Sequence, residues 1–215
     1  MLKRTVLACI AAVVSCSIAA VADQSPTYRG PMSASEKSFV AAIQADLMHR
    51  FPTAKDAEAA GYMRYTNEDN TGAISYANLH WTSPDIRHPS QLWYDKNGNL
   101  LGADFSVPYS GGDKRPNLFG VNPGRWFEFD DHVHYVQKGA DGQLQFDKWV
   151  EADRFRAAGG DPAHPTTATL IKLGRVKSAS EVTTVFDMPG IWDLIVWVKP
   201  NPDGAFANKN PNVKP

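Results

Sequence analysis

Hydrophobic residues recur at helical spacing near the start of the chain. Phe39, Ile43 and Leu47 are separated by four residues each, so they share one face of a helix. Ser33 opens a Ser-x-x-Glu sequence just before them, and this capping box is typical of a helix N-terminus. The pattern therefore predicts an amphipathic helix over residues 33–50 that buries this face.

The rest of the chain shows the pattern of short strands and turns. A second helix is expected over residues 53–61 and a third around 149–158. Segments rich in aromatic residues, bounded by Gly, Pro, Asn and Asp, predict strands at residues 62–66, 74–81, 91–94, 100–107, 125–138 (one long or two abutting strands) and 191–198. We therefore expect one α+β domain over residues 33–215, with a mainly antiparallel sheet and the two N-terminal helices packed on one side.

The first 22 residues have the features of an export signal, and residues 23–32 are expected to be a flexible lead-in. Two basic residues precede an apolar run over residues 5–14, which is too short to span a bilayer. Residues 20–22, Ala-Val-Ala, form a site for ordinary signal peptidase, whereas residues 13–16 resemble a lipobox that ends at Cys16. We expect an exported protein, periplasmic or extracellular, with an outer-membrane lipoprotein as the alternative.

The composition argues against disulfide bonds in the mature chain and against binding to nucleic acid. Both cysteines, Cys9 and Cys16, lie in the signal, so cleavage after Ala22 leaves a chain whose stability depends on packing without disulfides. The formal net charge is −1, and no cluster of Lys and Arg indicates binding to nucleic acid. A lipid on Cys16 would be the only attachment to a membrane.

The densest set of candidate metal ligands lies in residues 126–135. In a continuous strand alternate residues share a face, so one face would carry Glu128, Asp130, His132 and His134. Phe127 and Phe129 would lie on the opposite face. Imidazoles two residues apart have Cβ atoms about 7 Å apart and can bind one divalent metal ion as a cofactor, with Asp130 and a loop residue, His164, as further ligands. The same alternation is typical of the solvent-exposed face of a half-buried strand, and both interpretations stay open.

Abundant aromatic residues suggest a second hypothesis, an aromatic-lined cleft that binds a small molecule. The chain has six Trp, seven Tyr and ten Phe, and Trp81, Trp93 and Trp126 are the expected ligand contacts, with Tyr94 and Trp197 beside them. Aromatic residues also fill protein cores. No nucleophile elbow or phosphate-binding loop is present, so whether the protein is an enzyme stays open. A structural role at the cell envelope, through lipidated Cys16, is a third hypothesis.

Two stretches together resemble an uncharacterised family of secreted bacterial proteins. One covers residues 60–62 and 89–108, and the other covers residues 192–197 together with the pattern Asn-Pro-Asp-Gly-x-Phe-Ala-x-x-Asn-Pro-x-Val over residues 201–213. The resemblance implies a shared fold. It also implies that relatives carry histidines at the places of Ser75 and Ile195, so a family site would here be lost or moved to the histidines of residues 126–135.

Overall fold

The structure is a computed structural model that describes residues 26–215 except 79, 81–84 and 110–113. The larger of two sheets has the strand order β1 (Met63–Arg64), β2 (Ile74–Ala77), β3 (Gln91–Tyr94), β4 (Leu100–Pro108), β9 (Ile191–Trp197) and β5 (Phe127–Phe129). The smaller has the order β7 (Leu144–Glu151), β6 (His132–Lys138) and β8 (Val182–Met188). These strands pair antiparallel throughout. The predicted α+β class with mainly antiparallel strands is confirmed, although the strands form two sheets.

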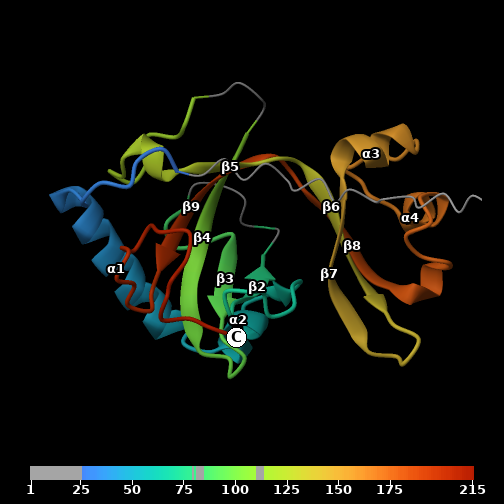
Figure 1. Ribbon diagram of the computed structural model, residues 1–215, viewed down its shortest axis with the longest axis horizontal. Coiled ribbons are helices and arrows are strands. Elements are labelled where there is room, and N and C mark those ends of the chain that lie inside the picture. Colours follow the sequence, from blue (N-terminus) through green and yellow to red (C-terminus); the bar gives the residue numbers. More distant parts are fainter. Residues whose placement is uncertain (1–25, 79, 81–84, 110–113) are drawn as a thin grey trace, which may run out of the picture.

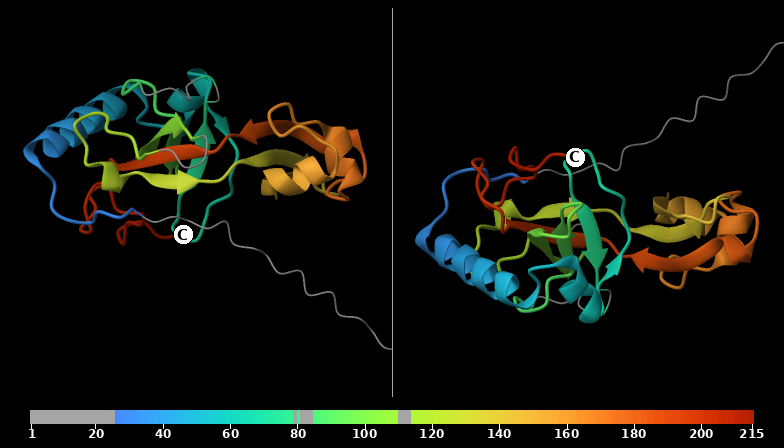
Figure 2. Two further views of the ribbon diagram at one scale, coloured as in Figure 1. Left: turned by 90° about the horizontal axis from the view of Figure 1, so that it is seen from above. Right: turned by 90° about the horizontal axis from the view of Figure 1, so that it is seen from below.

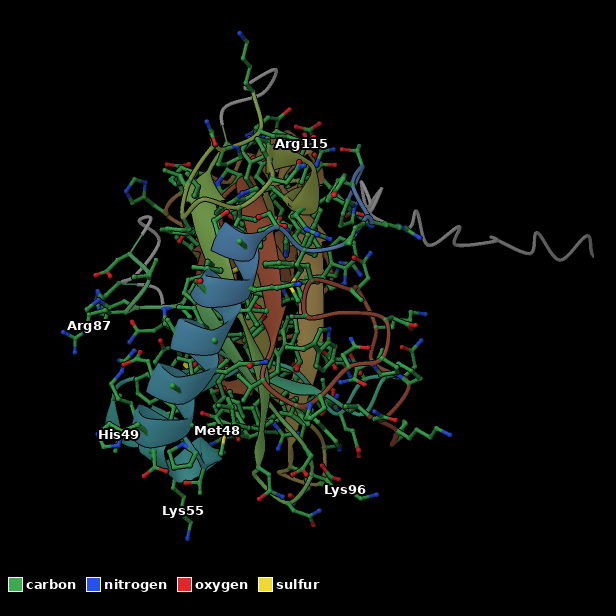
Figure 3. The ribbon with its side chains drawn as sticks, turned by 90° about the vertical axis from the view of Figure 1, so that its left-hand side faces the viewer. Met48, His49, Lys55, Arg87, Lys96 and Arg115 are labelled. Carbon is green, nitrogen blue, oxygen red and sulfur yellow. The ribbon has the colours of Figure 1, made fainter. Side chains whose placement is uncertain are left out.

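Helices α1 (Ala34–Arg50) and α2 (Ala54–Ala59) pack against one face of the larger sheet. The predicted capping box is present: the Glu36 N–H donates to the Ser33 hydroxyl, and the Ser33 N–H donates to the Glu36 carboxylate. The inner face of α1 buries Phe39, Val40, Ile43 and Leu47, and each buried side chain of this size contributes about 1.5–3 kcal/mol. Figure 3 shows α1 in front of the sheet, with Met48 and His49 at its lower, C-terminal end.

A two-stranded ribbon connects the two sheets. β5 leads into β6 and β8 leads into β9, while β5 pairs with β9 and β6 with β8. Figures 1 and 2 show this ribbon passing from the larger sheet to the smaller one. At another place the sheets are joined by Asp147 of β7, whose N–H donates to the Tyr65 carbonyl at 3.3 Å. Its carboxylate accepts the Asn67 N–H at 2.8 Å. The sheets are thus held together at two separate places.

The smaller sheet has its own helical cover. Helices α3 (Ala152–Ala157) and α4 (Thr167–Lys172) bury Phe155 and Leu170 against Val133, Tyr135 and Val150 of β6 and β7. The prediction of a helix from residue 149 is wrong at its start, because β7 continues to Glu151. Neither α4 nor β8 was predicted. With one face of the smaller sheet covered by α3 and α4, its other face is turned toward the larger sheet.

The short helix η1 (Pro123–Arg125) and the ends of the described chain lie against the larger sheet. The short helix η2 (Ala179–Glu181) directly precedes β8 and contacts α4, beside the smaller sheet. Tyr28, in the predicted lead-in, donates its N–H to the Gly124 carbonyl at 2.9 Å, and Phe206 and Val213 of the last segment are buried. Among the described residues, no helix combines the length and the apolar character needed to cross a membrane.

Candidate ligand-binding site

A pocket with a volume of about 400 Å³ lies between the two sheets. The larger sheet contributes Ser75, Gln91, Trp93, Asp104, Phe127, Phe129, Ile195 and Trp197. The smaller sheet contributes His132, His134 and Met188, and connecting segments contribute Tyr65, Thr66, Asp69, Thr71, Ala73 and Asn208. The pocket therefore exists because the ribbon brings the uncovered faces of both sheets together.

The pocket face of the larger sheet carries polar residues inside strands that are otherwise apolar. β4 and β9 are paired so that Asp104 lies opposite Ile195 and Ser106 lies opposite Asp193. Because alternate residues share a face, both carboxyls project from the same face as diagonal neighbours. The exposed fraction is 4% for Asp104 and 0% for Asp193, so both are removed from water.

The protein stabilises these two carboxylates unequally. Burial raises the pKa of Asp193 to about 7, although hydrogen bonds from the Ser106 hydroxyl and the Leu194 N–H favour its charged form. Burial also raises the pKa of Asp104 well above its ordinary value, the charge of Asp193 raises it further, and a hydrogen bond from Trp93 opposes both effects. Two adjacent buried carboxyls do not both ionise readily near neutral pH. Asp193, whose carboxylate accepts hydrogen bonds from Ser106 and Leu194, takes the charge and Asp104 keeps the proton.

One oxygen of Asp104 lacks a partner. Among the described residues, nothing hydrogen-bonds to its Oδ1, and the same holds for Oδ2 of Asp193. Asp193 is nevertheless bonded through its other oxygen, which accepts the Ser106 hydroxyl at 2.8 Å. Asp104 lines the pocket, whereas Asp193 does not. The unsatisfied carboxyl in the wall of the pocket is therefore that of Asp104.

Tyr65 forms part of the wall beside the carboxyl pair. Its hydroxyl donates to Oε1 of Gln91, and burial raises the pKa of Tyr65, with smaller contributions from Asp104 and Asp193. The ring also meets His134 edge to face, with 5.1 Å between ring centroids. Tyr65 therefore stays protonated and acts as a fixed hydrogen-bond donor.

His132 and His134 form a buried pair of neutral imidazoles on the opposite wall. Nδ1 of His132 donates to the Asp130 carbonyl at 2.8 Å, so its Nε2 accepts from Nε2–H of His134 at 3.0 Å. Burial lowers the pKa of His134 to about 3, with a smaller contribution from His132. Burial also lowers the pKa of His132, against the hydrogen bond to Asp130. Nδ1 of His134 has no partner among the described residues.

The structure separates the three tryptophans predicted to contact a ligand. Trp93 lines the pocket, together with Trp197. Trp126 is fully buried on the α1 side of the larger sheet. It does not line the pocket because the next residue, Phe127, does, and neighbouring residues of extended backbone point to opposite faces. Trp81 lies outside the described residues. Tyr94 also faces the α1 side, where its hydroxyl donates to the Phe51 carbonyl at 3.0 Å.

The predicted strand alternation is wrong at Asp130 and Asp131, where β5 ends and β6 has not yet begun. This break shifts the alternation by one residue, so Phe127 and Phe129 line the same pocket as the two histidines. The interpretation of the histidines as a solvent-exposed face is also wrong for His134, which is 9% exposed.

The other predicted metal ligands lie elsewhere. Asp130 is exposed and contributes only its carbonyl to His132. His164 is 86% exposed by its side chain and pairs with Asp161 at 2.9 Å. Among the described residues, no three His, Cys, Asp or Glu side chains are placed to hold a metal ion. The metal site therefore stays a prediction that rests on the His132–His134 pair.

The carboxyls at the centre of the site were missed from the sequence. Asp104 stands within Leu-Leu-Gly-Ala-Asp-Phe-Ser-Val, and Asp193 within Ile-Trp-Asp-Leu-Ile-Val-Trp. A lone acidic residue inside a strand that is otherwise apolar is a usable signal, because burying an unpaired carboxylate is unfavourable without a compensating partner.

Comparison of the chain with protein-family models, with curated proteins and with solved structures finds no match. The resemblance to a secreted bacterial family therefore stays a prediction, and the site is interpreted from its own geometry.

Proposed function

We propose that this protein is an exported binding protein whose ligand, a small organic molecule, occupies the pocket between the two sheets. The observation that carries the proposal is the pocket-lining carboxyl of Asp104, which is buried and has an oxygen without a partner among the described residues. A buried polar atom without a partner costs about 1–3 kcal/mol. A ligand that hydrogen-bonds to Asp104 would recover this cost.

The walls and size of the pocket support the same proposal. Its volume of about 400 Å³ lies within the range of about 300–1,000 Å³ that is common for small-molecule sites. Trp93, Trp197, Phe127 and Phe129 supply aromatic surface, and Gln91 and Asp104 supply polar groups. Apolar walls with a few polar groups are typical of such sites. Export follows from the signal predicted over residues 1–22.

Pocket-filling variants test the proposal. Ala73 and Ser75 are small residues of the pocket wall, so Ala73→Phe and Ser75→Phe each place a ring in the pocket. Thr183→Phe, at an exposed position of β8, is the matched control. The melting temperature of each folded variant is measured with a panel of small amines, alcohols, sugars, amino acids and carboxylic acids.

The expected result is that at least one compound stabilises the wild type and Thr183→Phe but neither pocket variant. The proposal is overturned if no compound stabilises the wild type. It is also overturned if the stabilising compounds act equally on both folded pocket variants.

A divalent-metal site is a second candidate function, favoured by the His132–His134 geometry. The Nε2 atoms are 3.0 Å apart, and the Asp130 carbonyl orients His132 through Nδ1, as second-shell carbonyls do for metal-binding histidines. Water or a ligand would complete the coordination. Zn²⁺ binding by calorimetry should be lost in His132→Ala and His134→Ala and kept in His164→Ala. Equal binding by all three variants would contradict this candidate.

A further inference from the structure

We infer that the ligand of this pocket is a small primary ammonium compound with an apolar body, held by Asp104 and enclosed by Trp93 and Trp197. The inference rests on the proposed function and names the chemical class of the ligand.

The charges around the pocket favour a cation. Asp69 and Asp104 line it, Asp193 is the diagonal neighbour of Asp104 on the next strand, and no lysine or arginine is among the described residues that form its walls. The remaining titratable groups of the walls are Tyr65, His132 and His134. Tyr65 is protonated and both histidines are uncharged near neutral pH, so no positive charge of the described walls neutralises the carboxyls.

The unpartnered oxygen of Asp104 requires a hydrogen-bond donor from the ligand once Asp104 is ionised. Its Oδ1 accepts no hydrogen bond from the described protein, whereas Oδ1 of Asp193 accepts one from the Ser106 hydroxyl. A primary ammonium group brings both N–H donors and a positive charge, and charge-assisted hydrogen bonds are stronger than neutral ones. A quaternary ammonium group has no N–H to donate, and a neutral alcohol brings no charge.

The aromatic walls fit the rest of such a ligand. The rings of Trp93 and Trp197 are tilted at 59° with 5.2 Å between centroids, and Phe127 and Phe129 form a second pair at 5.0 Å. Aromatic faces attract a cation and also pack against apolar groups. Trp197 already donates its indole N–H to the Ala207 carbonyl at 2.6 Å, so its indole N–H does not need a ligand as partner.

Binding is expected to release a proton. In the empty pocket the proton of the carboxyl pair lies on Asp104. An incoming R–NH₃⁺ stabilises the carboxylate, so Asp104–COOH loses its proton to the buffer and an R–NH₃⁺···⁻OOC–Asp104 pair forms. Atoms and charge balance, with one proton released for each bound amine. Affinity should therefore rise with pH over the range in which free Asp104 is still protonated.

Titration calorimetry with amine and alcohol pairs tests the inference. The probes are benzylamine against benzyl alcohol and 3-methylbutylamine against 3-methylbutanol, because each pair differs mainly in the charged nitrogen. Measurements at pH 7 in phosphate and in HEPES, neither of which is a primary amine, separate proton release from intrinsic heat, because the two buffers have different ionisation enthalpies. We expect each amine to bind at least about tenfold more tightly than its alcohol, with release of close to one proton.

Two variants provide the controls. Asp104→Asn, nearly identical in shape, should lower amine affinity about tenfold or more and abolish proton release. Glu128→Gln makes the same carboxyl-to-amide replacement on β5, outside the pocket walls, and should bind amines as the wild type does. Folding of both is checked by melting temperature. Asp104→Ser replaces Asp104→Asn if the latter does not fold.

The outcomes distinguish the ligand class from the function. If alcohols or other neutral compounds bind in the pocket as tightly as the amines, the ammonium inference fails and the proposed function stands. If amines bind equally to Asp104→Asn or without proton release, the inference also fails. If no compound of any class binds, the proposed function fails with it.

Discussion

Ser106 donates a hydrogen bond of 2.8 Å from its hydroxyl to Oδ1 of Asp193 on the neighbouring strand. The adjacent pocket-lining carboxyl, Asp104, has no such donor at its Oδ1 among the described residues. This difference directs the charge of the pair to Asp193 and leaves Asp104 as the group whose ionisation the fold does not support. A carboxyl in that state destabilises the empty protein and is available to a ligand.

The stability of the wild type should fall as the pH rises between the unfolded and folded pKa values of this pair. The pKa of Asp193 rises from the ordinary 3.8 to about 7 on folding, and that of Asp104 also rises. The native state therefore binds more protons than the unfolded state across this range, so the free energy of unfolding decreases until both carboxyls are ionised. Asp104→Asn removes one group and the repulsion that it causes. Urea unfolding from pH 4 to pH 8 should show that the free energy of unfolding of Asp104→Asn increases relative to that of the wild type as the pH rises.

The control for this measurement is Glu128→Gln, whose free energy of unfolding should differ from that of the wild type by a constant amount from pH 4 to pH 8. A constant difference between Asp104→Asn and the wild type over the same pH range would contradict the prediction.

Much of the fold followed from local patterns in the sequence. Ser33 and Glu36 marked the start of α1 because the capping box is a short-range interaction. The apolar run of β9 indicated a strand buried on both faces, and it lies between β4 and β5. β8 has no such signal, because its partly exposed residues alternate poorly. Its pairing with β6 is a long-range interaction that no local pattern specifies.

The site was only partly predictable for the same reason. Trp93, His132 and His134 attracted attention by residue type, and all three line the pocket. Trp126 is a tryptophan like Trp93, but it faces α1. It precedes Phe127, the first residue of β5, whose side chain is on the pocket face. Asp104 lies in the site because β4 pairs with β9, and this pairing brings together residues about 90 positions apart in the chain.

Variants of Asp147 test the second connection between the two sheets, which is made by its hydrogen bonds to Tyr65 and Asn67. Its φ is +56°, which costs most L residues about 1 kcal/mol, and its carboxylate accepts the Asn67 N–H. Asp147→Asn keeps an acceptor and tolerates this backbone conformation, so its unfolding free energy should stay within about 0.5 kcal/mol of the wild type. Asp147→Ala loses the hydrogen bond and should cost about 1–2 kcal/mol. Urea unfolding at pH 7 measures both.

Asp147→Gly separates the two contributions to this cost. Glycine also lacks the acceptor but adopts positive φ without strain, so it should be more stable than the alanine variant. An alanine variant as stable as the glycine variant would show that backbone strain at this position contributes little.

The proposed export makes a prediction about the mature N-terminus. Cleavage by ordinary signal peptidase after Ala22 gives a chain that begins at Asp23, whereas lipoprotein processing gives a chain that begins at lipidated Cys16. Intact mass and N-terminal sequence of the protein secreted from a bacterial host should show Asp23, and Cys16→Ser should leave both unchanged. Retention of the wild type in membranes, with release by Cys16→Ser, would favour the lipoprotein alternative.

The wild type should lose stability in acid, because protonation of Glu36 breaks its buried ion pair with Arg125. Burial alone would raise the pKa of Glu36, but hydrogen bonds from Arg125, at 2.9 Å, and from the Ser33 and Asn122 N–H groups lower it from 4.5 to about 2. A carboxyl with a lowered pKa stabilises the fold above its unfolded pKa, and this contribution is lost as the pH falls from about 4.5 to 2. Glu36→Gln leaves the guanidinium buried without its counter-charge, so we expect a cost of roughly 3–5 kcal/mol at pH 7.

The partly exposed pair of Asp46 and Arg50 provides the contrast that makes the Glu36 prediction specific. Asp46→Asn removes one carboxylate from the same helix, α1, but water solvates the remaining charge, so the cost should be at most about 1 kcal/mol. Urea unfolding of both variants and the wild type from pH 7 to pH 2 should show the difference between Glu36→Gln and the wild type shrinking as Glu36 becomes protonated. A difference that stayed constant down to pH 2 would mean that Glu36 stabilises the fold through its shape and packing and not through its charge.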